Sequence, residues 1–213
     1  MKLNRDSRRD DIQVRESHEM YRGAIWSIQR DTFEFGDEIL VRDFMRHMGA
    51  VAILAINEQE EILTIRQYRH PVGMDMIEIP AGLIDAVDEV PLEAAKRELF
   101  EETGYMADGW KVLVDMCNSP GSSTETLRIY LARGLTRGEW RTEDLSGEEK
   151  EIQQSWIPVP DALAHILTGR WQSPTAVAGV LSYVASRGDA LRDASCEWLG
   201  RDLNVENGRI FEP

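Results

Sequence analysis

The stretch PLEAAKRELFEETGY, which runs from Pro91 to Tyr105, decides the fold of this chain. Pro91 suits the first turn of a helix, and Ala, Leu, Glu and Lys favour the helix interior. Gly104 can take the left-handed conformation that ends a helix. An apolar stripe recurs at i, i+3 and i+7, formed by Leu92, Ala95 and Leu99. The stretch therefore predicts an amphipathic helix that packs its apolar face on a core.

Three carboxylates share another face of this predicted helix. Glu98, Glu101 and Glu102 lie at i, i+3 and i+4, where like charges repel by about 0.2–0.5 kcal/mol per pair. Two interpretations are open: the face is simply solvated, or a cation binds there. Mg2+ and Mn2+ prefer hard oxygen ligands and often bridge to substrate phosphates. Arg97, four residues before Glu101, can hold a carboxylate in place by a bidentate contact.

Upstream of the helix, apolar β-branched runs alternate with polar turns. Residues 24–35 and 39–45 predict a hairpin around a glycine-containing turn, and Ala50–Ile56 and Glu61–Tyr68 predict paired strands of a main sheet. Pro80 and Gly82 interrupt the strand signal. They predict a loop that leads into the carboxylate face and offers backbone carbonyls as further ligands.

Downstream of the helix, the pattern predicts three strands and then two helices. The strands are expected at 110–117, 126–135 and 152–159, and the helices at 160–170 and 173–188. The tail from Leu191 onward is ambiguous. Strands, a helix, strands and helices in this order predict an α+β sandwich with helices flanking a mixed sheet.

The composition excludes some partners and compartments. The 213 residues include 24 Lys plus Arg and 38 Asp plus Glu, a formal net charge of −14. This argues against an electrostatic binder of nucleic acid or anionic membranes. Cys117 and Cys196 form neither a disulfide framework nor a zinc pattern. With no apolar run of about 18 residues, we expect a soluble cytoplasmic protein.

A set of spaced residues resembles the Nudix box, G-x5-E-x7-R-E-U-x-E-E-x-G-U, in which U is apolar. The second part matches at every position from Glu89 through Arg97 to Tyr105. Six residues, rather than five, separate Gly82 from Glu89, so either the loop carries one extra residue or Asp88 replaces the first Glu. The segments EIPAGLID, RQYR and NSPGSSTE resemble the branch of the family that hydrolyses ADP-ribose and related nucleoside diphosphate sugars.

The resemblance implies a Nudix-type α/β/α sandwich with a mixed sheet and an additional N-terminal β segment. We expect this segment at 1–48, with a role in dimerisation, the Nudix hydrolase domain at 49–190 and a C-terminal tail at 191–213. Enzymes of this branch use such a segment to pair two subunits and complete the substrate pocket. The resemblance therefore implies a homodimer.

The resemblance also implies a Mg2+ site, with Mn2+ as the alternative. Glu98 and Glu102 are the expected main ligands, Glu101 assists directly or through water, and the Ala81 carbonyl completes the site. Structural roles fall to Gly82, Glu89, Arg97 and Gly104. A solvated acidic face with ordinary surface ion pairs is the simpler interpretation, but it leaves the full motif unexplained.

Three further residues match positions that contact substrate in the resembling enzymes. Arg69 matches a guanidinium that meets the diphosphate or the terminal ribose, and Trp26 an N-terminal aromatic that stacks on adenine. Glu125 matches a contact to metal or ribose. Each has a plainer alternative: an exposed arginine, a core tryptophan and a loop carboxylate.

The catalytic base is expected in the loop DLSGEEKEIQQ. Glu148, Glu149 and Glu151 are the candidates, and the offset to the following strand favours Glu149. The expected reaction cuts ADP-ribose into AMP and ribose 5-phosphate. The alternatives are another nucleoside diphosphate derivative, such as an ADP-sugar or a dinucleotide, a nucleotide-sensing module, and an interaction protein without turnover. The intact glutamates disfavour the sensing module.

Overall fold

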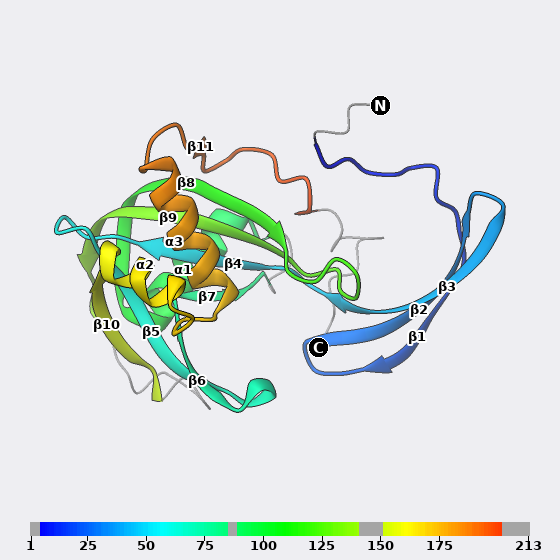
Figure 1. The fold of residues 1–213 in the computed structure, drawn as a ribbon, viewed down its shortest axis with the longest axis horizontal. Coiled ribbons are helices and arrows are strands. Elements are labelled where there is room, and N and C mark those ends of the chain that lie inside the picture. The colour runs from blue at the N-terminus through cyan, green and yellow to red at the C-terminus, as the bar shows by residue number, and fades with distance from the viewer. Residues whose placement is uncertain (1–4, 85–88, 141–150, 202–213) are drawn as a thin grey trace.

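The centre of the computed structural model, which describes residues 5–84, 89–140 and 151–201, is a five-stranded mixed sheet (Figure 1). Its strand order is β11-β8-β9-β4-β7. β4 pairs in parallel with β9 and antiparallel with β7, and β8 pairs antiparallel with β9 and β11. The bounds are β4 Ala50–Ala55, β7 Ala81–Leu83, β8 Tyr105–Cys117, β9 Thr126–Arg137 and β11 Arg192–Asp193.

A three-stranded sheet of order β10-β5-β6 lies beside the central one. It contains β5 (Glu61–Arg69), β6 (Met74–Glu78) and β10 (Gln153–Pro158), with the short 3-10 helix η1 (His70–Val72) between β5 and β6. The predicted pairing of β4 with β5 is wrong. Only an isolated bridge between Ile56 and Ile62 joins them. β4 is almost uniformly buried, as a central strand covered on both faces is, and β9 and β7 occupy its two edges.

Helices cover both faces of the central sheet. α1 (Pro91–Thr103) packs against alternate β4 residues such as Val51 and Ile53, while α2 (Val159–Leu167) and α3 (Pro174–Ser186) pack on the side of Leu54 and Ile56. The α+β sandwich expected from the sequence is therefore confirmed. No helix in the described ranges is both long and apolar enough to cross a membrane.

The predicted helix at the centre of the sequence argument is confirmed as α1. Ala94, Ala95 and Leu99 are buried on the core. Pro91 occupies the first turn, and Gly104 follows the last residue with φ of 73°, in the left-handed region. One helix thus places the carboxylate face against the short strand β7, which the sequence had predicted as a loop.

The first strands form a separate antiparallel sheet that extends away from the main body (Figure 1). It contains β1 (Val14–Arg22), β2 (Trp26–Phe35) and β3 (Glu38–His47). β2 and β3 form the predicted hairpin. β1 was not predicted, because all nine of its residues are exposed and it buries no apolar face. β3 leads directly into β4, so this sheet is connected to the core through a central strand.

Candidate active site

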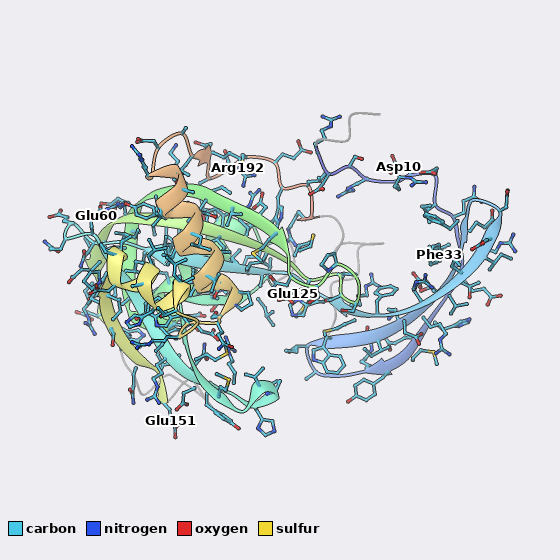
Figure 2. All side chains as sticks on the ribbon, in the orientation of Figure 1. Asp10, Phe33, Glu60, Glu125, Glu151 and Arg192 are labelled. Carbon is cyan, nitrogen blue, oxygen red and sulfur yellow. The ribbon has the colours of Figure 1, made fainter. Side chains whose placement is uncertain are left out.

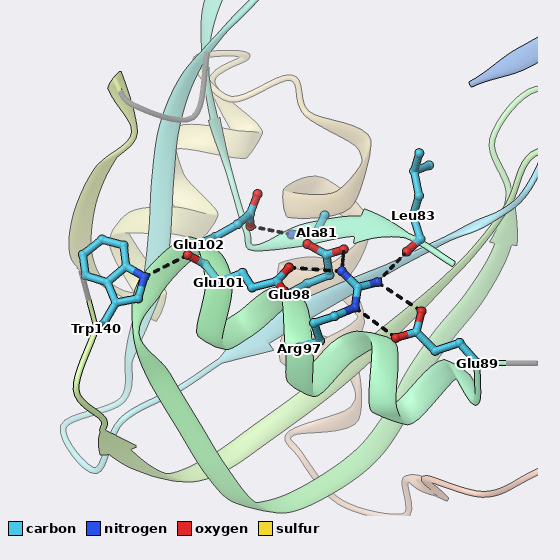
Figure 3. A network of polar contacts seen from close by, with 8 residues as sticks. All are labelled: Ala81, Leu83, Glu89, Arg97, Glu98, Glu101, Glu102 and Trp140. Carbon is cyan, nitrogen blue, oxygen red and sulfur yellow. Dashed lines mark hydrogen bonds and ion pairs between the residues drawn. The ribbon is translucent and has the colours of Figure 1, made fainter. Parts of the chain in front are cut away.

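Arg97 lies at the centre of a polar network on the face of α1 that meets β7 (Figure 3). Its Nε and Nη2 donate to the two carboxylate oxygens of Glu89 at 3.0 and 3.1 Å. Its Nη1 donates to Glu98 at 2.7 Å and to Glu101 at 3.1 Å, and Nη2 also donates to the Leu83 carbonyl at 3.2 Å. The hydrogen bonds that Arg97 donates to the Glu89 carboxylate raise the pKa of Arg97 further above its ordinary value. One permanent cation therefore holds three carboxylates.

Two of the α1 carboxylates meet the backbone of β7. The Ala81 amide donates to Glu102 Oε2 at 3.0 Å, and Glu102 is buried. Gly82 has no side chain, and a Cβ there would lie only 2.0–2.4 Å from the carboxyl atoms of Glu98. The Glu98 carboxylate thus occupies the space that a side chain at position 82 would need. This close approach requires glycine at position 82 and brings Glu98 and Glu102 to one short strand.

The donors on this face suit a hard divalent cation. They are the carboxylates of Glu98, Glu101 and Glu102 and the backbone oxygens of β7, which is the ligand chemistry of Mg2+ and Mn2+. As they stand, no three His, Cys, Asp or Glu side chains in the described ranges form a metal-binding group. Glu98 and Glu101 turn toward Arg97, and Glu102 toward the Ala81 amide. The residues fit the ion, and binding it requires these side chains to exchange partners.

Arg69 is held by a buried carboxylate that the sequence analysis did not single out. Its Nε and Nη2 donate to the two oxygens of Glu78 at 3.0 and 2.6 Å. The Glu78 side chain is only 7% exposed and also accepts a hydrogen bond from Gln67 at 3.3 Å. Glu78 precedes Ala81 by three residues, so Arg69 is tied to the segment that enters β7. The only available signal was its place in EIPAGLID.

Trp26 lies in the N-terminal sheet, where it pairs with His47. Its ring packs on Tyr21 at 5.8 Å between centroids, and its carbonyl accepts from the Gly23 amide. All of these contacts are with residues of the N-terminal segment, and none is with a residue of α1. Within one chain, the structure does not bring Trp26 together with the carboxylates.

Glu125 lies at the end of a loop that β3 holds in place. Thr124 accepts a hydrogen bond from the His47 amide at 2.9 Å and donates its own amide to the Met45 carbonyl at 2.9 Å. The Met45 amide donates to the Ser122 carbonyl at 2.8 Å. Figure 2 shows Glu125 where the main body meets the N-terminal sheet. The N-terminal sheet therefore positions the loop that carries this candidate residue.

His47 is a titratable group that interacts electrostatically with Glu125. Its side chain is buried, and Nδ1 accepts a hydrogen bond from the Gly49 amide at 3.1 Å. Burial lowers the pKa of His47 below its ordinary value of 6.5, while the negative charge of Glu125 acts to raise it. Burial has the larger effect, so His47 is neutral at pH 7.

The three candidate bases divide between described and undescribed parts of the chain. Glu148 and Glu149 lie outside the described residues. Glu151 is exposed (Figure 2) and comes two residues before Gln153, the first residue of β10, which pairs with Arg66 on β5. Glu151 therefore lies near the end of the strand that carries Arg69.

Comparison with known proteins agrees with this architecture. The family model of the NUDIX domain matches residues 45–178 of this chain. The chain belongs to the Nudix family. Six residues, rather than the five of the Nudix box, separate Gly82 from Glu89. The ion pair between the box glutamate and arginine is nevertheless formed, because Arg97 makes a bidentate contact with Glu89. The alternative residue, Asp88, lies outside the described ranges.

Several curated Nudix relatives and one solved structure are similar to the chain. It is 38% identical to an ADP-ribose pyrophosphatase of Mycobacterium tuberculosis, over 90% of this chain and 93% of that protein. It is 31% identical to a methanol dehydrogenase activator of Bacillus methanolicus, over 76% and 87%. A crystal structure of an ADP compounds hydrolase shares the fold, with a TM-score of 0.70, 20% identity and coverage of 87% and 99%.

Proposed function

We propose that this Nudix protein hydrolyses the diphosphate bond of ADP-ribose to give AMP and ribose 5-phosphate, with Mg2+ or Mn2+ as cofactor. The relative that is 38% identical over 90% of the chain is named an ADP-ribose pyrophosphatase. The observation that carries the chemistry is the convergence of Glu98 and Glu102 on the Ala81–Gly82 backbone. A solvated acidic face would not require a glycine whose missing side chain makes room for a carboxylate.

In this proposal the glutamates and the arginine of the box on α1, together with Ala81 on β7, have defined roles. Glu98, Glu102 and the Ala81 carbonyl hold the ion, and Glu101 assists directly or through water. When bound, the ion neutralises charge on the phosphoryl oxygens and lowers the pKa of attacking water. Arg97 keeps the ligands on one side of the helix through its contacts with Glu98 and Glu101.

Substrate contacts fall to Arg69, Glu125 and Trp26. Arg69 meets the diphosphate or the terminal ribose, and its bidentate contact with Glu78 fixes the plane of the guanidinium. Glu125 contacts the metal or the ribose from the loop that β3 holds. Trp26 stacks on the adenine.

The base is a carboxylate that takes a proton from the attacking water. We propose it among Glu148, Glu149 and Glu151. Replacing each by Gln separates them: loss of the base lowers kcat and removes the acidic limb of the pH profile, whereas loss of a surface carboxylate changes neither.

A second substrate class has support of its own. A GDP-mannose pyrophosphatase of Yersinia enterocolitica is 31% identical over 59% of this chain and 67% of that protein. Another nucleoside diphosphate sugar is therefore the alternative substrate, and a dinucleotide is the next one to test.

A substrate panel tests the assignment. ADP-ribose, ADP-glucose, GDP-mannose, NADH, diadenosine polyphosphates and 8-oxo-dGTP would be compared by kcat/KM with Mg2+ and with Mn2+. We expect ADP-ribose to rank first. A tenfold lead by any other compound would reject ADP-ribose while leaving Nudix hydrolysis in place.

We further propose that the protein works as a homodimer. The N-terminal sheet exposes apolar side chains on all three strands, including Met20, Tyr21, Ile39 and Val41. These exposed apolar side chains would be covered if the sheet packed on a second copy, which would stabilise the dimer. The proposed division is a dimerisation segment at 1–48, a Nudix domain at 49–190 and a tail at 191–213, whose strand β11 pairs with β8 of the central sheet. Pairing would bring Trp26 to a site.

We propose a cytoplasmic location for this dimer. Cys117 is free and exposed, and such a thiol stays reduced in the cytoplasm. Nucleoside diphosphate sugars are the proposed partners.

A further inference from the structure

The carboxyl end of α1 carries two of the proposed metal ligands and also a set of backbone acceptors. An α-helix leaves its last four carbonyls without partners inside the helix. In α1 these include the carbonyls of Glu101 and Glu102 themselves. How these two carbonyls are satisfied decides how firmly the ligand-bearing turn is held.

The carbonyl of Glu101 accepts a hydrogen bond from Trp140. The indole Nε1 donates to it at 2.8 Å (Figure 3). The body of the same indole packs on Gly104, where a Cβ would lie 2.5 Å from the Trp140 Cβ. Gly104 is thus required for close packing of Trp140 as well as for its left-handed φ. Trp140 both caps and covers the end of the helix.

The next two carbonyls are satisfied by Gln154 on β10. Its Nε2 donates to the carbonyls of Glu102 and Thr103, each at 3.2 Å. The remaining carbonyl of the turn, that of Phe100, accepts the Gly104 amide at 2.7 Å. All four carbonyls of the last turn therefore have partners, and two of the donors are side chains from outside the helix.

We propose that Trp140 and Gln154 are positioning residues for the carboxylates of Glu101 and Glu102. Helix ends fray when their terminal carbonyls lack partners. Ligand positions must hold within about 0.5 Å for a productive site. Loss of either donor frees the turn from which both carboxylates project. The inference rests on the proposed metal site, but it concerns two residues that the Nudix box does not contain.

The position of the two donors in the sequence adds to this role. Trp140 precedes the segment that contains Glu148 and Glu149, and Gln154 follows it. The chain on both sides of the candidate bases is thereby fastened to the turn that carries the candidate ligands. A single substitution at either donor should therefore weaken metal binding.

The test compares Mn2+ binding by Trp140→Phe and Gln154→Met with that of the unmodified full-length chain. Free Mn2+ is measured by electron paramagnetic resonance without substrate, so the readout does not depend on turnover. Each variant removes a donor and keeps most of the side-chain volume. We expect the Mn2+ dissociation constant to rise roughly tenfold, the lower end of what outer-shell partners contribute. The Mn2+ dissociation constant of the double variant, Trp140→Phe with Gln154→Met, should be at least as high as that of either single variant.

Two matched controls are available in the same chain. Trp110 Nε1 donates to the Ala107 carbonyl at 2.9 Å, and Gln172 Nε2 donates to the Gly169 carbonyl at 3.2 Å. Trp110→Phe and Gln172→Met make the same chemical changes at nearly the same distances, but at hydrogen bonds to carbonyls that do not belong to α1. They should bind Mn2+ like the unmodified chain.

Each outcome decides the inference. Unchanged Mn2+ binding in both variants, or an equal loss in the controls, would overturn it. If Trp140→Phe does not fold, Gln154→Met alone carries the test, because Gln154 lies on β10, whereas Trp140 follows the end of β9. If the unmodified chain binds no Mn2+, the proposed metal site is wrong and the positioning role is rejected with it. The order of measurement thus distinguishes the two failures.

Discussion

Replacing Gly82 by alanine should separate activity from stability. The new Cβ would lie 2.0 Å from the carboxyl carbon of Glu98, whereas ordinary contact begins at 3.4 Å, so the carboxyl group must retreat by about 1.4 Å. A displacement of about 1 Å at a catalytic group can cost roughly 100-fold in rate. We therefore expect kcat/KM for ADP-ribose to fall about 100-fold, which is about 2.7 kcal/mol of transition-state stabilisation.

The same substitution should cost little stability. The atoms that must move are the end of a flexible side chain, and Arg97 keeps Glu89 and Glu101 when its 2.7 Å contact with Glu98 is lost. One charged hydrogen bond contributes about 1.5 kcal/mol at the lower end. This predicts a decrease in melting temperature of about 3–6 °C for a chain of this size.

The assay measures kcat/KM, Mn2+ binding and thermal unfolding on the same preparation. Gly109→Ala is the control, because its Cβ would meet its nearest neighbour, Arg133 on the paired strand β9, at an ordinary contact distance of 3.7 Å. Combining Gly82→Ala with Glu98→Asp, which shortens the carboxylate by one methylene, should recover part of the Mn2+ binding. If Gly82→Ala left kcat/KM and Mn2+ binding unchanged, this would refute the reasoning that activity requires the close approach of the Glu98 carboxylate to β7.

Three further predictions follow from particular contacts. Arg69→Ala should raise KM for ADP-ribose more than it lowers kcat, because a grip on the diphosphate is shared by ground and transition states; a pure loss of kcat in initial-rate kinetics would contradict this. Burial lowers the pKa of His47, so the unfolded chain binds this proton first, and the free energy of unfolding should fall as pH drops below about 6.5. Urea unfolding of His47→Gln should lack this component, and an identical pH dependence would reject it. Light scattering at micromolar concentration should give a dimer, and a fully active monomer would exclude the role proposed for Trp26.

The parts of the fold that the sequence predicted correctly have local causes. α1 follows from consecutive signals: Pro91 at its start, an apolar stripe ending at Leu99, and Gly104 after its end. The hairpin of β2 and β3 follows from two apolar runs around Gly36, which has φ of 61°. Neighbouring residues decide each of these elements.

The parts that the sequence did not predict depend on distant partners. β1 is a strand because β2 supplies its hydrogen bonds, while its own side chains carry no burial pattern. β4 and β5 follow each other in the chain, yet they lie in different sheets because β9 takes the edge of β4. Strand signals identify strands but do not identify pairing partners.

The candidate site divides in the same way. The spacing in the Nudix box named the carboxylates around Arg97. Glu78, Trp140 and Gln154 were not found, because their roles arise from contacts across sheets and helix ends. A carboxylate in a strand or a glutamine at a strand start gives no signal of its own.

Phosphorus NMR of ADP-ribose hydrolysis by the unmodified chain and by Glu102→Gln tests the central claim most directly. With saturating Mg2+, the unmodified chain should convert the two diphosphate signals into two monophosphate signals, from AMP and ribose 5-phosphate. Glu102→Gln keeps the size of the side chain and its contact with the Ala81 amide but removes the charge, so it should lose most turnover. Glu93→Gln, on the exposed face of the same helix where Glu93 pairs with Lys96, should remain active. Near-normal turnover by Glu102→Gln, or intact diphosphate signals with the unmodified chain, would contradict metal-dependent hydrolysis at this site.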